Sequence, residues 1–147
     1  MRALVNHWGS MRDKKLIVLV TLIIILNVGH IVDHVARGDF PWPLDAWSVP
    51  PIVFVLVSNA ILGFGLYFYV KGKVGPLFWA IVAGLGIVVA WRGHLSPFTE
   101  QTPQYICRAY ASPIVGGLAV AWFVALVLLL IVTAVYAEYL WARGLKN

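Results

Sequence analysis

The stretch LIVLVTLIIILNVGHIVDHVA, residues 16–36, contains no lysine or arginine, and Asp33 is its only acidic residue. A single α-helix needs about 20 consecutive apolar residues to cross the hydrocarbon core of a bilayer. Arg12, Lys14 and Lys15 precede the stretch, as basic residues do in a signal peptide, but it is too long for one and no small-residue cleavage pattern follows. We therefore expect residues 16–36 to form a membrane-spanning helix of the mature protein.

Three further apolar segments follow, at residues 51–70, 76–91 and 113–141. The segment at 76–91 is short for a membrane span, and the one at 113–141 is long enough to tilt or to project past the surface. The chain is 61% hydrophobic and 12% charged, whereas soluble domains are roughly 45–50% apolar and 25% charged. We predict an all-α integral membrane protein, a four-helix transmembrane bundle built as a single domain over residues 1–147.

The basic residues indicate how the bundle is oriented. Most of them share one side, namely Arg2, Arg12, Lys14, Lys15, Lys71, Lys73, Arg143 and Lys146, whereas Arg37, Arg92 and Arg108 lie on the other. Cytoplasmic loops are enriched in lysine and arginine, so we predict that both termini are cytoplasmic in a plasma membrane of bacterial type. The loops at 37–50 and 92–112 then face outward. The net charge of +5 reflects this topology, and we expect lipid rather than nucleic acid as the partner.

Polar side chains recur along one face of the first expected helix. At 100° per residue, about one third of the helix circumference holds them all, and they are Asn27, His30, Asp33, His34 and Arg37. Lipid cannot satisfy such groups, so this face should point into the bundle. Ionisable side chains at membrane depth are costly and usually have a function or a partner. This polar stripe therefore marks the candidate functional site.

The histidines of the stripe have the spacing of metal ligands. His30 and His34 are four residues apart, which lets one helix offer two imidazoles to one ion. His94 follows the third apolar segment and should reach a similar height, and Asp33 is either a further ligand or an acceptor that orients a ring. The predicted metal ligands are His30, His34, His94 and Asp33, and the predicted outer hydrogen-bonding partners are Asn27, Glu100 and Arg37.

This donor set suits zinc, copper or non-haem iron. Haem is a further option, although histidines at positions i and i+4 cannot both bind one iron axially, so His94 or a second subunit would supply the other axial ligand. A structural interpretation stays open as well. Asp33 and Arg37 are spaced as an ion pair. Ser58 and Asn59 of the second helix should lie at about the depth of Asn27, so the whole stripe is open to interpretation as a hydrogen-bond network between helices.

Three functions follow from these alternatives. The first is a His/Asp site near the outer face that binds a metal ion or haem for redox or hydrolytic chemistry. The second is a non-catalytic accessory or assembly subunit of a membrane complex, and the third is a small proton-coupled transporter that must oligomerise. The nucleophile-elbow, phosphate-loop and zincin motifs are all absent from the sequence, so the pattern does not decide whether the protein is an enzyme. A homo-oligomer or a larger complex is compatible with each function.

The expected outer loop at 92–112 is long for a connection without secondary structure. Its apolar residues Phe98, Tyr105 and Ile106 favour a loop that folds back over the bundle, either as a lid over the polar stripe or as an interfacial connector. Cys107 is the only cysteine, which excludes an intrachain disulfide and a cysteine-based zinc site.

Overall fold

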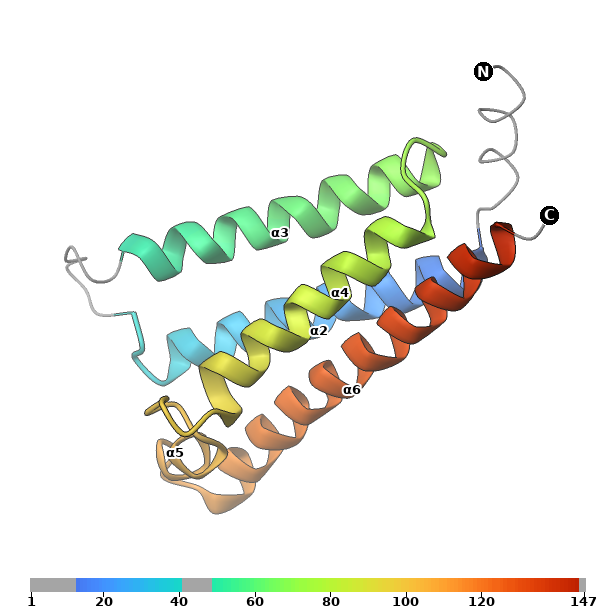
Figure 1. The fold of residues 1–147 in the computed structure, drawn as a ribbon. Coiled ribbons are helices and arrows are strands. Elements are labelled where there is room, and N and C mark those ends of the chain that lie inside the picture. Colours follow the sequence, from blue (N-terminus) through green and yellow to red (C-terminus); the bar gives the residue numbers. More distant parts are fainter. Residues whose placement is uncertain (1–12, 41–48, 146–147) are drawn as a thin grey trace.

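The computed structural model describes residues 13–40 and 49–145 of the chain. Over these residues the chain is helical, with no β-strand (Figure 1). The elements are α2 (Lys14–Ala36), α3 (Val49–Val70), α4 (Pro76–Ala90), the π-helical turn η1 (Trp91–Leu95), α5 (Pro103–Arg108) and α6 (Pro113–Gly144). Four described spans are long and apolar enough to cross a membrane, and these are Lys14–Ala36, Val49–Val70, Pro76–Leu95 and Pro113–Gly144. The predicted all-helical fold with four spans is confirmed.

Local sequence signals explain where the helices begin. The carboxylate of Asp13 accepts a hydrogen bond from the Leu16 amide at 3.0 Å, so α2 begins two residues before the predicted start. Pro76 and Pro113 each occupy the first turn of their helix, where a missing N–H costs nothing. At the other end, α6 continues to Gly144 rather than to residue 141.

The third span is longer than the sequence indicates, because α4 continues directly into η1. The Ser96 amide donates to the Trp91 carbonyl at 2.8 Å, and the Ser96 hydroxyl donates to the Arg92 carbonyl at 3.0 Å. The helix therefore ends at Leu95 and not at residue 91, and the predicted loop at 92–112 is shorter and contains α5. As a result His94 belongs to the last helical turn instead of the loop.

Helix packing leaves most of the surface apolar. α6 packs against both α4 and α2, whereas α3 makes its substantial helix contact with α2. Small residues allow close approach, since a Cβ atom at Gly29 would clash with the Trp122 ring. Between 11% and 22% of each spanning window is buried inside the protein, so the remaining apolar surface needs lipid around it. These features are those of a multi-pass membrane protein.

The predicted orientation, with both termini cytoplasmic, stays a prediction. Figure 1 places the start of α2, the α3–α4 turn and the end of α6 at one end of the bundle, which agrees with the grouping of the basic residues. Arg2, Arg12 and Lys146 lie outside the described residues. The end of α2, η1 and α5 lie at the opposite end, which we call the histidine end.

Candidate metal-binding site

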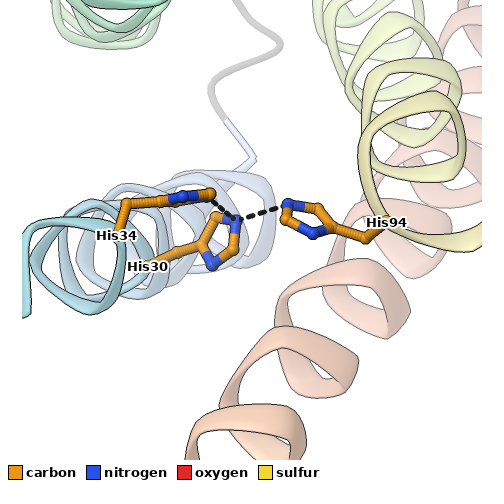
Figure 2. Close-up of side chains that lie close together, drawn as sticks. All are labelled: His30, His34 and His94. Atoms are coloured by element: carbon orange, nitrogen blue, oxygen red, sulfur yellow. Dashed lines mark hydrogen bonds between the residues drawn. The ribbon is translucent and has the colours of Figure 1, made fainter. Parts of the chain in front are cut away.

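Three histidines meet at the histidine end of the bundle (Figure 2). His30 and His34 come from the last turns of α2, and His94 comes from η1. The Nε2 atom of His30 is 3.2 Å from the Nε2 atom of His94 and also 3.2 Å from that of His34. One ring nitrogen from each histidine lies within 4.8 Å of the other two. The structure therefore brings together the three histidines that the sequence singles out.

These separations match the distances within a metal coordination shell. With Zn–N bonds of 2.0–2.1 Å and tetrahedral angles, two ligating nitrogens lie about 3.3 Å apart. The two His30 separations of 3.2 Å have this value. The ring nitrogens of His34 and His94 lie within 4.8 Å of each other.

The cluster sits in aromatic surroundings. The Phe123 ring of α6 lies with its centroid 4.7 Å from that of His94 and 5.4 Å from that of His30. The ring centroid of Phe40 lies 6.0 Å from that of His34, and His94 is only 7% exposed. An ion at this place would be largely shielded from water, and each nitrogen that faces it must do so as a lone pair.

Asp39 fixes the orientation of His34. Its Oδ2 atom is 2.8 Å from His34 Nδ1, and Arg37 Nη2 is 3.2 Å from the same nitrogen. A carboxylate only accepts and a guanidinium only donates, so Nδ1 of a neutral ring can hydrogen-bond with only one of them. The carboxylate contact is shorter, and Arg37 already has two carboxylate partners. We assign the proton to Nδ1, which leaves the lone pair of His34 on Nε2.

The backbone of the loop after η1 does the same for His94. Its Nδ1 atom lies 2.9 Å from the carbonyl oxygen of Gln101, which can only accept. The proton of neutral His94 is therefore on Nδ1, and its Nε2 also carries a lone pair. Metal-bound histidines commonly donate the second ring N–H to a carboxylate or a backbone carbonyl, and both kinds of acceptor occur here.

His30 completes the cluster in a different way. Its Nε2 faces the lone pairs of His34 and His94, so in the metal-free protein it carries the proton that they share. One proton cannot point at both acceptors, and one of the two 3.2 Å contacts is then left without a well-aligned hydrogen bond. An ion that displaced this proton would bind all three nitrogens at once.

Arg37 joins the two acidic residues next to the cluster. Its side chain is fully buried, with Nη1 2.7 Å from Asp39 Oδ2 and Nη2 3.0 Å from Asp33 Oδ2. The guanidinium also lies 5.7 Å from the ring centroid of Tyr105 on α5, and it donates to the side chain of Gln101 at 3.4 Å. The Asp33–Arg37 ion pair expected from the sequence is confirmed, and Arg37 reaches His34 through Asp39.

The structure does not bring Asp33 into the histidine cluster. Its Oδ2 atom binds Arg37, and its Oδ1 atom accepts a hydrogen bond from the Tyr110 hydroxyl at 2.6 Å. Burial and this hydrogen bond raise the pKa of Tyr110 to about 12, so its hydroxyl stays protonated and keeps donating. With both oxygens engaged, Asp33 stabilises Arg37 rather than facing the three Nε2 atoms.

Two of the predicted outer partners lie elsewhere. Asn27 donates to the side chain of Asn59 at 3.2 Å and so links α2 to α3, as the structural interpretation expects. Glu100 is exposed in the loop before α5. The groups that contact the histidines instead are Asp39, Gln101 and Phe123, which sequence reasoning missed.

One sequence signal points to Asp39. Gly38 has a φ of 75°, and its amide donates to the Val35 carbonyl while the Asp39 amide donates to the His34 carbonyl. This is the Schellman motif that glycine favours after a helix. It places the residue after the glycine beside the last helical turn, where His34 is.

No family model matches the chain, and neither curated proteins nor solved structures gave a significant match.

Proposed function

We propose that this membrane protein binds one metal ion through the Nε2 atoms of His30, His34 and His94, and that the ion carries out redox or hydrolytic chemistry at the outer membrane face. The convergence of the three Nε2 atoms carries the proposal. The Nδ1 contacts of His34 and His94 support it, because they direct the lone pairs of both rings toward the same point.

The donor set favours a single ion over haem. Axial imidazoles bind haem iron from opposite sides of the porphyrin plane. The three rings here pack against one another, with centroids 4.6–5.4 Å apart, which leaves no room for a macrocycle between them. Three imidazole nitrogens suit zinc and copper best among the common ions, with iron as a further option.

The charges beside the cluster bear on the state of the ion. Asp33 and Asp39 are negative and Arg37 is positive, so this network has a formal charge of −1 while the imidazoles are neutral. A monovalent copper ion would balance it. A divalent ion would leave one positive charge, which an anionic fourth ligand such as hydroxide would balance. Uncompensated charge is costly in such surroundings, so we expect one of these two states.

Each state corresponds to a class of chemistry. Three protein ligands leave an open position, which is typical of catalytic zinc sites, and zinc there would lower the pKa of a bound water for hydrolysis. Copper would instead serve electron transfer or oxidation. If the termini are cytoplasmic, the histidine end faces outward and the substrate or redox partner comes from that side.

A structural role is the second candidate, and the buried ion-pair network favours it. Arg37 is satisfied by Asp33, Asp39 and Gln101 without any ion, and these contacts fasten the end of α2 to the loop before α5. In this case the protein would be an accessory or assembly subunit, and the Nε2 atoms of the three histidines would hydrogen-bond only with one another.

Metal analysis distinguishes the two. The protein is purified in detergent, dialysed against zinc, copper or iron, and analysed by plasma mass spectrometry and absorption spectroscopy. We expect about one equivalent of one metal, lost in His30→Ala and His94→Ala variants that keep their helical circular dichroism. His7→Ala, which changes the remaining histidine of the chain, serves as the matched control and should keep the metal. Absence of stoichiometric metal after every dialysis would reject the proposal and favour the structural role.

A further inference from the structure

An apolar groove lies between α3 and α4, away from the histidines. It has a volume of about 340 Å³, and its lining includes Val57, Ala60, Phe64, Phe68, Val74 and Phe78. The groove exists because α3 packs mainly on α2 while α4 packs on α6. The two helices are connected by the short turn at residues 71–75, which Figure 1 shows at the end opposite the histidine end.

Lys73 stands at the end of the groove, and Lys71 lies in the same turn. Lys73 Nζ lies 5.6 Å from the ring centroid of Phe68, which lines the groove, and Lys71 Nζ lies 5.7 Å from that of Tyr67. No aspartate or glutamate occurs in the turn KGKVG at 71–75. Within the described part of the chain, neither ammonium forms an ion pair with a carboxylate. Both positive charges are therefore available to a ligand.

The backbone holds Lys73 in this place. Gly72 has a φ of 71°, its amide donates to the Tyr69 carbonyl, and the Lys73 amide donates to the Phe68 carbonyl at 2.8 Å. This second Schellman motif sets Lys73 directly beside Phe68. The backbone of Lys73 at the groove end is thus positioned by the fold.

We propose that the groove and the two lysines bind one anionic phospholipid. An acyl chain fills the apolar groove between α3 and α4, and the phosphate of the headgroup contacts Lys71 and Lys73. The apolar lining favours a hydrocarbon chain, because polar groups of a ligand would find no hydrogen-bonding partners in the groove. Paired cations at the membrane surface select an anionic headgroup over a zwitterionic one. The proposal is independent of the metal site.

Lipid selectivity tests the headgroup contact. The full chain is reconstituted in phosphatidylcholine vesicles, and electron spin resonance measures how strongly spin-labelled phosphatidylglycerol and phosphatidylcholine associate with it. From the contribution of two lysines near the surface we expect roughly a 30-fold preference for phosphatidylglycerol. A K71S/K73S variant should lose the preference, whereas K14S/K15S, which removes two exposed lysines at the same end of the bundle, should keep it.

A second pair of variants tests the groove itself. Ala60→Phe places a ring in the groove and should release the immobilised phosphatidylglycerol, whereas Val53→Phe, at an exposed site of α3 outside the lining, should not. Equal association of both lipids with the parent protein would overturn the proposal. An unchanged preference in K71S/K73S would also overturn it. An Ala60→Phe variant with an altered oligomeric state but unchanged lipid binding would overturn it as well, since the groove would then hold a second copy of the chain.

Discussion

Replacing Asp39 with alanine tests the metal site without touching any of its three histidines. In the structure Asp39 Oδ2 accepts from His34 Nδ1 at 2.8 Å and binds Arg37 Nη1 at 2.7 Å. When the carboxylate is removed, the nearest polar group to Nδ1 is Arg37 Nη2, at 3.2 Å. This group can only donate, so it favours the tautomer with the proton on Nε2 and blocks the lone pair that the metal needs.

The expected effect on metal binding is large enough to measure. Loss of a hydrogen-bonding partner behind a metal-bound histidine typically lowers affinity 10- to 100-fold, which is roughly 1.4–2.7 kcal/mol. Folding should suffer less than after loss of a whole buried ion pair, which costs about 3–5 kcal/mol, because Arg37 keeps Asp33. We expect a loss of about 1–3 kcal/mol in the free energy of unfolding, as for a buried donor left with fewer partners.

Competition with a chelator of known affinity provides the assay, with the metal identified by the dialysis experiment. Asp39→Asn retains an acceptor for Nδ1 but removes the charge, so its affinity should lie between those of the parent and of Asp39→Ala. Glu138→Gln makes the same charge change at an exposed position of α6 and should bind like the parent. An Asp39→Ala variant that is folded and binds the metal within threefold of the parent would refute the assigned role of Asp39.

Two further predictions concern proton competition and helix packing. Imidazoles bind metals only when neutral, so protons compete with the ion for the three ring nitrogens. Metal binding should therefore weaken by tenfold or more as the pH is lowered from 7.5 to about 4. Chelator competition across this range measures the effect, and a profile that stays flat throughout it would contradict histidine ligation. Gly29→Val should destabilise the bundle by roughly 1–3 kcal/mol, as overpacking does, because the new side chain meets the Trp122 ring. Denaturation in mixed micelles measures this loss, and Gly63→Val, at a position with open space around it, is the control. Equal stability of the two variants would contradict the packing of Gly29 against Trp122.

The helices can be predicted from the sequence because the lipid environment imposes a simple rule. Every backbone group in hydrocarbon must be hydrogen-bonded, and a long apolar stretch such as residues 16–36 meets this requirement within itself by forming a helix. The predicted helix boundaries are wrong by a few residues, because single side chains determine where a helix begins or ends. Asp13 extends α2 by capping it, and Ser96 helps to extend the third span through η1.

The candidate site was only partly predictable. Helical periodicity places His30 and His34 on one face, and the shared depth of two helix ends places His94 near them. The separation of Asp33 from the cluster was not predictable, because Tyr110, which binds it at 2.6 Å, lies on a distant part of the chain whose fold the sequence does not specify. The contact of His94 with the Gln101 carbonyl involves a backbone atom, and residue identity carries no information about it.

The π-helical turn η1 makes the histidine cluster sensitive to chain length. Each residue of a helix turns the following side chains by about 100°, and a π-turn accommodates one more residue than an α-turn would. Deleting a single residue between Ala90 and His94 could therefore leave four intact apolar helices and a normal bundle. The imidazole would nevertheless be carried around the helix axis, away from His30. The number of residues in this segment, and not only their chemical nature, therefore determines the direction in which the His94 side chain points from the helix axis.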